Sequence, residues 1–165
     1  MSYSFQFIVD QWKLISGAVE WSLPSNPESG TIGFLAPLAI EGVTIAEFAL
    51  RGRAYAHQPN EAITLQVEVG VSNSRTREAL VRLDWRPLSP IHKNPDKRQI
   101  YGTHIHPFAL NWSETELRML TNNLPWATVS EDPVDFLGPL KLGKKLFKIS
   151  DIEKIPEPPW SRQLL

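Results

Sequence analysis

The sequence predicts an α+β fold, an antiparallel meander sheet of four to five strands with an N-terminal helix and two C-terminal helices. Three observations predict it. Apolar residues near the N-terminus have helical spacing, the middle of the chain alternates apolar and polar residues, and helical spacing returns after Pro107. The alternation is strictest over 62–71, where every second side chain is apolar, as in a strand with one buried and one exposed face.

A first helix is expected over about residues 5–15. Its apolar residues recur at spacings of three and four, which forms one apolar face; they are Phe5, Ile8, Trp12 and Ile15. Ser4 is suited to cap this helix, because its hydroxyl can accept a hydrogen bond from a backbone N–H of the first turn. We expect the helix to lean on the sheet, with Trp12 in the core.

Four strands follow, the first with the weakest pattern: about 31–40, 43–55, 62–71 and 79–86. The linkers at 57–61 and 72–77 are short and contain Pro, Asn or Ser, which favours antiparallel connections. Parallel pairing would need longer crossovers. The segment 100–108 alternates in the same way and supplies a further short strand.

The C-terminal third returns to a helical pattern. Ser113 and Glu116 form a capping-box pattern that predicts a helix over about 113–122. A last helix is expected from 133 or 134 to about 147, kinked or in two parts because of its glycines and proline. The Pro-rich tail, 155–165, is expected to be an extended strap or disordered.

Length and composition predict one globular domain spanning 1–165, because 165 residues with 42% hydrophobic side chains suffice for one sizeable core. There is no apolar run of about 18 residues and no secretory signal pattern, so we expect a soluble, cytoplasmic protein without membrane contact. The chain has no cysteine, which excludes disulfides, thiolate nucleophiles and Cys-ligated metal sites. P-loop, GxGxxG, HExxH, EF-hand and GxSxG patterns are also absent.

Positive charge is concentrated in one segment, 75–106, although the chain as a whole carries a formal charge of −1. This segment has seven Arg and Lys against three acids, and it holds three of the four histidines. A basic, imidazole-rich face indicates a negatively charged partner, RNA among them. The same groups could also hold a metal ion, position a phosphate or face water.

Strand parity places the candidate residues on a common face. Val81, Leu83 and Trp85 point to one side of the strand over 79–86, and the side chains at the intervening positions point to the other; these are Arg82, Asp84 and Arg86. His104 and His106 share a face of the next short strand by the same argument. If that strand pairs beside the strand over 79–86, the two polar rows meet. Trp85, with Phe136 farther along the chain, is expected in the core.

The two histidines at His104 and His106 could converge on one metal ion or one phosphate. With His92 or Asp84 as a third ligand, the ion could be zinc or manganese. The alternative is two polar strand residues that face solvent beside a sheet edge. Our leading interpretation requires no metal and no cofactor.

The charged row is open to two interpretations. Alternating charges on an exposed strand face usually serve solubility or cross-strand pairing. In the functional interpretation, Asp84 orients an imidazole, while Arg82 and Arg86 hold phosphate oxygens. Further phosphate or base contacts are expected from Lys93 and Arg98 in the basic loop over 87–99, and from Trp112 by stacking, with core packing as its alternative; these three are binding candidates.

The strings RLDWRPLSPIHKN (82–94) and THIHPF (103–108) resemble the pattern of small bacterial toxin-type proteins of the TumE kind. The resemblance implies a compact α+β ribonuclease that a cognate antitoxin blocks. It implies a catalytic site at the residues of the matching motif: Arg82, Asp84, His92, His104 and His106.

Three functions therefore stay open. The sharpest hypothesis is a metal-independent endoribonuclease of a bacterial toxin–antitoxin or phage-conflict system, with histidines as acid and base and arginines as a phosphate clamp. The second is a non-catalytic protein-interaction module of a phage or defence operon. The third is a His-ligated metal hydrolase. Whether the chain is an enzyme depends on whether the three imidazoles converge.

Overall fold

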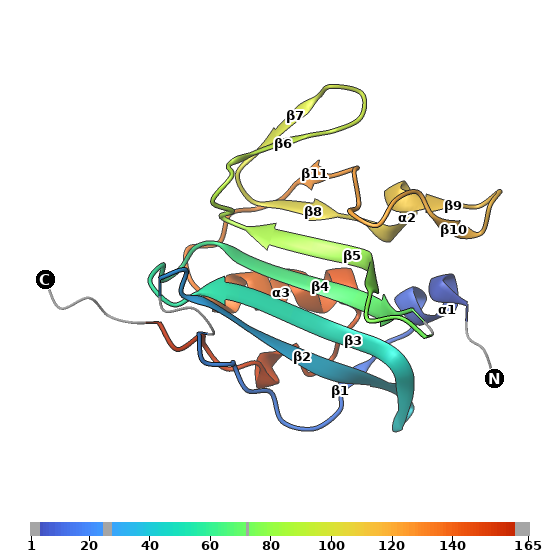
Figure 1. Ribbon diagram of the computed structural model, residues 1–165, viewed down its shortest axis with the longest axis horizontal. Coiled ribbons are helices and arrows are strands. Elements are labelled where there is room, and N and C mark those ends of the chain that lie inside the picture. Colours follow the sequence, from blue (N-terminus) through green and yellow to red (C-terminus); the bar gives the residue numbers. More distant parts are fainter. Residues whose placement is uncertain (1–3, 25–27, 72, 161–165) are drawn as a thin grey trace, which may run out of the picture.

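The computed structural model describes residues 4–24, 28–71 and 73–160. Its main feature is a seven-stranded antiparallel sheet in the order β1-β2-β3-β4-β5-β8-β11 (Figure 1). The strands of this sheet are β1 (Leu14–Ile15), β2 (Thr31–Ile40), β3 (Val43–Tyr55), β4 (Ile63–Gly70), β5 (Arg77–Trp85), β8 (His104–His106) and β11 (Thr128–Val129). The α+β class and the antiparallel meander are confirmed. The expectation of four to five strands was too low, because two-residue strands extend both edges.

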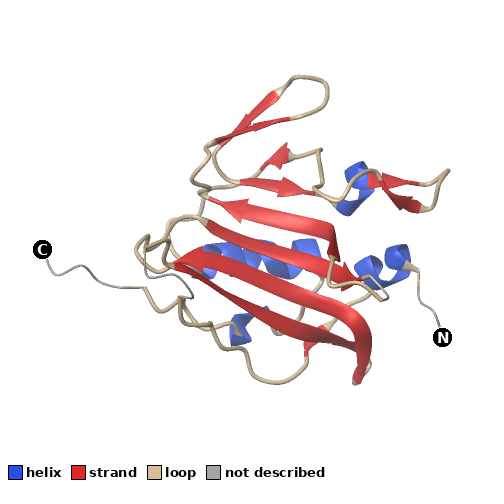
Figure 2. Ribbon diagram, viewed as in Figure 1, coloured by secondary structure: helices blue, strands red, loops and turns tan. Residues whose placement is uncertain are grey.

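The described residues also form two hairpins and four helical segments. Figure 2 shows the helices in blue and the strands in red. The hairpins pair β6 (Ile91–Lys93) with β7 (Gln99–Tyr101), and β9 (Trp112–Ser113) with β10 (Arg118–Met119). The helices are α1 (Phe5–Asp10), α2 (Phe108–Asn111), α3 (Leu137–Phe147) and the 3-10 helix η1 (Ile152–Lys154). Within the described ranges, no helix combines the length and apolarity that crossing a membrane requires.

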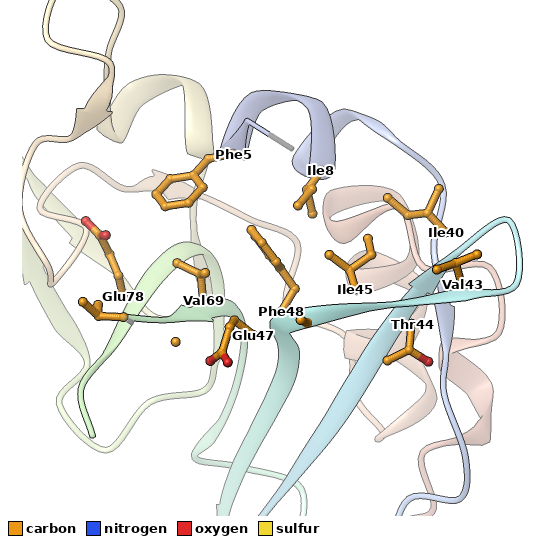
Figure 3. A pocket seen from close by; sticks show the side chains of 13 residues that line it. Phe5, Ile8, Ile40, Val43, Thr44, Ile45, Glu47, Phe48, Val69 and Glu78 are labelled. Atoms are coloured by element: carbon orange, nitrogen blue, oxygen red, sulfur yellow. The ribbon is translucent and has the colours of Figure 1, made fainter. Parts of the chain in front are cut away.

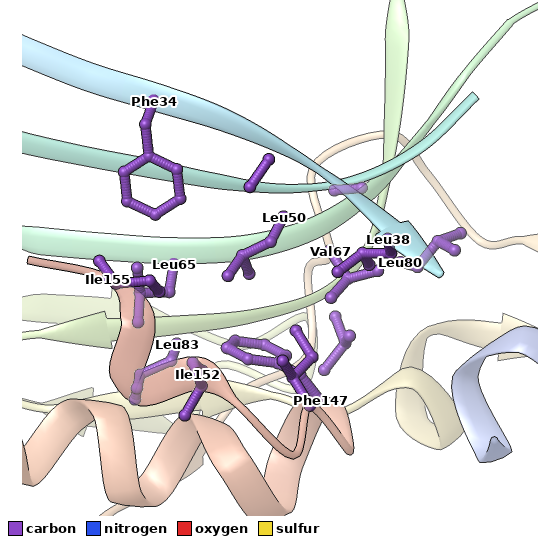
Figure 4. Close-up of a cluster of buried hydrophobic side chains, with 14 of the residues drawn as sticks. Phe34, Leu38, Leu50, Leu65, Val67, Leu80, Leu83, Phe147, Ile152 and Ile155 are labelled. Carbon is purple, nitrogen blue, oxygen red and sulfur yellow. The ribbon is translucent and has the colours of Figure 1, made fainter. Parts of the chain in front are cut away.

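The core lies between one face of the sheet and the C-terminal elements (Figure 4). Leu50, Leu65 and Leu83 come from neighbouring strands and pack with Phe147 of α3. Burying such large aliphatic side chains stabilises the fold by roughly 1.5–3 kcal/mol each. Trp85 is also fully buried, as expected, and Phe136 joins this cluster. Because side chains alternate along each strand, the opposite face of the same strands is free for polar groups.

The first helix is shorter than the sequence suggested. It ends at Asp10, since Gln11 is extended, and the next residues join the sheet as β1. The buried Lys13 side chain explains this ending, because its Nζ atom donates to the carbonyl oxygens of Ile8 and Gln11 at 2.7 and 2.6 Å. Trp12 is 54% exposed, so its expected place in the core was wrong. Ser4 caps the helix through Phe7 N–H as predicted.

The helix expected over 113–122 does not form. Ser113 Oγ accepts a hydrogen bond from the Glu116 N–H at 3.2 Å, as a capping box requires. Leu117 then adopts a φ of 52°, a left-handed conformation that a helix does not allow, and the chain turns back as a hairpin. The same side-chain contact therefore closes a turn rather than opening a helix.

The last helix starts later than expected, at Leu137. Gly138 and Pro139 lie in its first turn, where a missing N–H costs nothing, so neither residue breaks the helix. The described part of the Pro-rich tail, 155–160, packs as a strap: Trp160 lies edge-on to the Phe136 ring, with centroids 6.1 Å apart. Residues 161–165 lie outside the described part of the chain.

Candidate functional site

Two rows of polar side chains cross four strands on the sheet face opposite the core. The register places one member of each row on β3, β4, β5 and β8. The first row is Arg51, Gln66, Arg82 and His106, and the second is Arg53, Thr64, Asp84 and His104. The meeting of the Arg82–Asp84 row with the two histidines is therefore confirmed. It follows from antiparallel pairing of β5 with β8.

A third histidine lies next to the two histidines of β8. His92 lies on β6, and its ring centroid is 5.3 Å from that of His104 and 4.8 Å from that of His106. The His104 and His106 centroids are 5.0 Å apart. One ring nitrogen of each histidine lies within 4.8 Å of the others. We call His92, His104, His106 and Asp84 the histidine cluster.

Backbone carbonyl oxygens orient all three imidazoles. Each carbonyl can only accept a hydrogen bond, so the ring nitrogen that contacts it carries a hydrogen. The contacts are His104 Nδ1 to Gly102 O at 2.7 Å, His106 Nδ1 to Leu124 O at 2.6 Å, and His92 Nε2 to Pro125 O at 2.8 Å. In a neutral ring the other nitrogen then has a lone pair. The rings are held in a defined orientation, as in sites where an imidazole exchanges a proton or binds a metal.

In two histidines, the ring nitrogen that does not contact a backbone carbonyl lies next to one oxygen of Asp84. Asp84 Oδ2 lies 3.3 Å from His104 Nε2 and 3.1 Å from His106 Nε2. Arg82 donates to the same oxygen from Nε at 2.8 Å and reaches His106 Nε2 from Nη2 at 2.8 Å. His106 can thus be neutral and accept from Arg82. The contact between His104 and Asp84 needs a proton or another cation between two acceptors.

Burial and neighbouring groups shift the pKa values of Asp84 and His106. Burial by itself raises the pKa of Asp84, but hydrogen bonds with His104 and His106 and the charge of Arg82 outweigh it and hold this pKa far below its usual range. Burial lowers the pKa of His106; Asp84 opposes this shift and Arg82 adds to it. At neutral pH we therefore expect an ionised Asp84 beside a neutral His106.

A polar pocket of about 230 Å³ opens beside the cluster. Its walls come from β3, β4 and β5, and its lining residues are Arg51, Arg53, Thr64, Gln66, Arg82 and Asp84. Arg53 is exposed, whereas Arg51 is held by the buried carboxylate of Glu68 at 2.8 Å. Asp84 belongs to both the pocket and the cluster, so it connects solvent with the buried histidines.

A larger pocket, of about 780 Å³, lies next to α1 and the turn between β2 and β3 (Figure 3). Phe5, Ile8, Ile45 and Phe48 make its lining mainly apolar. No histidine, arginine or lysine lines it. Its ionisable side chains are two glutamates, which would repel a phosphate, so we place the candidate site at the smaller pocket, where arginines lie beside a carboxylate that contacts the histidines.

Two buried asparagines hold the segments that carry the orienting carbonyls. Asn94, in the hairpin of β6 and β7, donates to the Ala127 carbonyl at 3.0 Å and accepts from its N–H at 2.9 Å. Asn111 makes the same pair of bonds with Trp126, each at 2.9 Å. These bonds fix the hairpin and the segment around Pro125 next to β8. Sequence analysis did not identify either asparagine.

Three of the expected binding residues take no part in the cluster or the pocket. Arg86 has a φ of 45° just beyond β5 and pairs with Asp132 at 2.9 Å, so it does not continue the Arg82–Asp84 row. Lys93 is exposed on β6, and Arg98 is engaged with Asp96 at 2.5 Å. The basic loop over 87–99 is largely the hairpin of β6 and β7.

Trp112 packs against other aromatic side chains, which is the alternative to the base stacking considered for it. Its ring is stacked on Phe108 with centroids 5.1 Å apart and contacts Phe5 at 6.1 Å. The pocket instead contains two arginines that sequence analysis missed, Arg51 and Arg53. Strand parity over 43–55 could have identified them, because both belong to the polar face of a strand that was expected.

Comparisons of the chain with protein-family models, with curated proteins and with solved structures gave no match. The chemistry of the site is therefore argued from its geometry.

Proposed function

We propose that the chain is an endoribonuclease, with the pocket as the phosphate site and the histidine cluster as the source of acid–base groups. The observation that carries the proposal is the position of Asp84, which lines the arginine pocket and contacts two oriented imidazoles. A phosphodiester in the pocket would thus lie between fixed cations and titratable groups. This combination suits phosphoryl transfer, in which positioning and charge stabilisation dominate.

Arg53 and Arg82 are the proposed phosphate clamp. Both line the pocket, and Arg53 has an exposed side chain that can reach a ligand. A guanidinium offers two parallel N–H donors to phosphate oxygens, which fixes the direction of the bound group. Arg51 adds positive charge while it stays paired with Glu68. Arg86 has no place in this clamp, because it is engaged by Asp132.

The proposed reaction is metal-independent transesterification of RNA. The 2′-oxygen attacks phosphorus and its proton goes to a neutral imidazole, for which His106 is suited by its lowered pKa. The bond from phosphorus to the 5′-oxygen breaks, and that oxygen takes a proton from an imidazolium. His104 can supply it through the Asp84 contact, and the half-buried His92 lies nearer to solvent than the other two imidazoles. The products are a 2′,3′-cyclic phosphate and a 5′-hydroxyl.

A second candidate is a His-ligated metal hydrolase acting on the same bond. It is favoured by one observation, the lone pairs of three carbonyl-oriented imidazoles beside a carboxylate. In this version the three imidazoles and Asp84 would hold a metal ion, which would supply Lewis-acid chemistry. Water would then be activated by the metal, and the arginines would keep their role.

The cellular setting is part of the proposal. A ribonuclease of this size fits a toxin–antitoxin or phage-conflict system, in which a protein partner would block the arginine pocket. The alternative function, a non-catalytic interaction module, would use the surface without needing the cluster intact.

The test is an RNA cleavage assay with purified full-length protein, with and without a chelator. We compare wild type with His104→Ala plus His106→Ala, and use His57→Ala as the matched control, since His57 lies outside the cluster. Cleavage in chelator by wild type and His57→Ala, lost in the double variant, supports the metal-independent enzyme. Cleavage only without chelator favours the metal hydrolase. Equal cleavage by all proteins, or none by any, removes the proposal.

A further inference from the structure

We infer that His92, His104, His106 and Asp84 form a binding site for one divalent transition-metal ion, with zinc as the preferred ion. The inference goes beyond RNA cleavage and does not depend on it. It concerns an ion bound by the same cluster that the proposed function uses as the source of acid–base groups, so the metal-bound cluster is an alternative state of that site.

The hydrogen-bond directions carry the first step. Each imidazole donates one N–H to a backbone carbonyl, so the lone pair of a neutral ring lies on its second nitrogen, the atom that can form a ligand bond. Protein zinc sites commonly fix their histidines in this way, since the carbonyl sets both the tautomer and the ring orientation. All three histidines of the cluster have this arrangement. One such contact is common on any surface, whereas three around one centre indicate a site.

The spacing carries the second step. Zinc held about 2.0–2.1 Å from each nitrogen places three imidazole centroids roughly 5 Å apart in a tetrahedral arrangement. The observed centroid separations are 5.3, 4.8 and 5.0 Å. The ring nitrogens lie within 4.8 Å of one another, and a bound ion would draw them to about 3.3 Å. The ring centroids are thus already at the required separation, and the most distant ring nitrogens would have to approach one another by about 1.5 Å.

Burial carries the third step. His104 and His106 are 3% and 0% exposed, and Asp84 is 8% exposed. Acceptors that face one another without water are costly unless a cation lies between them. Arg82 partly fulfils this need through its bonds to Asp84 and His106, but His104 Nε2 contacts the Asp84 carboxylate, which is itself an acceptor. A metal ion would satisfy His104, His106 and Asp84 together.

Arg82 must move for the ion to bind, because its Nη2 atom occupies the lone pair of His106. The pocket offers it room, since Arg82 is part of the pocket wall. Removing the guanidinium should therefore strengthen metal binding, an effect opposite to that of removing a ligand. Arg82→Met keeps the length of the aliphatic stem and removes only the competing donor.

The ligand set selects the class of ion. Three imidazole nitrogens and one carboxylate oxygen suit zinc or another late divalent transition metal, while Mg²⁺ and Ca²⁺ prefer oxygen ligands throughout. Four protein ligands would close a tetrahedral shell. A closed shell is typical of a structural zinc site, whereas release of Asp84 toward the pocket would open a position for water.

The experiment measures Zn²⁺ binding to untagged, full-length protein by calorimetry after removal of metal by dialysis against chelator. We expect one Zn²⁺ per chain for wild type and for His57→Ala, and binding at least about 100-fold weaker for His92→Ala and Asp84→Asn. Arg82→Met should bind more tightly than wild type. Circular dichroism checks that each variant is folded.

The inference is overturned if wild type binds no Zn²⁺, or if His92→Ala binds it as tightly as wild type. Should the variants fail to fold, Co²⁺ bound to wild type decides: the visible spectrum of a tetrahedral ion supports the site, and an octahedral spectrum contradicts it. Zinc binding without RNA cleavage would remove the proposed function and leave this inference standing. RNA cleavage in chelator by a protein that binds no zinc would do the reverse.

Discussion

Asp84 Oδ2 on β5 lies 3.3 Å from Nε2 of His104 on β8, its direct cross-strand partner. Because His104 Nδ1 is committed to the Gly102 carbonyl, this contact needs a proton or a metal ion between its two atoms. Asp84 also lines the arginine pocket. A single carboxylate therefore joins the groups that could hold a phosphate to the groups that could transfer a proton.

Replacing Asp84 by Asn should slow RNA cleavage about 100-fold or more, because the amide keeps the shape of the carboxylate and loses its charge. The measurement is the single-turnover rate at saturating RNA. The matched control is Asp96→Asn, which removes a carboxylate that pairs with Arg98 in the hairpin away from the pocket. A wild-type rate in the Asp84 variant would exclude Asp84 from the chemistry.

Replacing Arg53 by Gln should weaken RNA binding, because one phosphate contact of the pocket is lost. The slope of log K against log salt should become less steep by about 0.7, the value for one contact to a single strand. Fluorescence anisotropy at several salt concentrations measures both quantities. Arg98→Gln is the control, since its guanidinium lies outside the pocket; an equal change in both variants would argue against a specific phosphate site.

Asn94→Ala should loosen the hairpin that carries His92. The N–H and carbonyl of Ala127 lose their partners, which costs about 1–3 kcal/mol of folding free energy. Zinc affinity should also fall by about 10- to 100-fold, because Asn94 positions His92 without touching the ion. Urea unfolding and zinc calorimetry measure the two effects.

A matched comparison separates positioning from general stability. Trp21→Phe loses the bond from Nε1 to the Pro156 carbonyl, at 2.8 Å, in a part of the chain remote from the hairpin. It should lower stability and leave zinc affinity unchanged. If it weakens zinc binding as much as Asn94→Ala does, the role given to Asn94 is wrong.

Because Lys13 is buried, we expect it to make the free energy of unfolding depend on pH. Burial, and then the charge of Lys148, lower the pKa of Lys13 to about 8 in the folded protein, although Asp10 opposes the shift. Between pH about 8 and about 10.4 the unfolded chain binds more protons at this residue than the folded chain, so Lys13 makes stability rise with pH. The slope is at most about 1.4 kcal/mol per pH unit.

Comparison with Lys13→Met isolates this contribution, since other lysines and tyrosines titrate in the same range. Urea unfolding of both proteins at pH 7, 8, 9 and 10 should show wild type gaining on the variant above pH 8. A constant difference over this range would mean that Lys13 titrates normally. Below pH 8 the difference should be flat, because Lys13 is then charged in both states.

Much of the site followed from strand parity. Two-residue alternation predicted strands over about 31–40, 43–55 and 62–71, where the structure has β2, β3 and β4, and the same rule placed Arg82 and Asp84 on one face with the histidines of β8. Parity works here because one sheet face is buried, so a slip of one residue would expose the core. The antiparallel pairing of β5 with β8 then fixed which residues meet.

His92 was a candidate residue, but whether it reaches the other histidines depends on contacts between distant segments. His92 reaches the cluster because Asn94 ties its hairpin to Ala127, a bond between residues 33 positions apart. No local pattern predicts such a pairing. The short first helix has a similar cause, because its end is set by the buried Lys13 side chain rather than by apolar spacing. The Ser113 hydroxyl accepts the predicted hydrogen bond from Glu116 N–H, but this bond stabilises a turn and not a helix.

The most direct test of the histidine cluster is long-range ¹H–¹⁵N NMR of protein labelled in its four histidines, recorded before and during addition of Zn²⁺. We predict fixed hydrogen on Nδ1 of His104 and His106 and on Nε2 of His92, and shifts of the opposite nitrogens of these three rings on binding, with His57 unchanged. Rapidly exchanging tautomers in all four histidines, with no response to the ion, would contradict the cluster as a functional site.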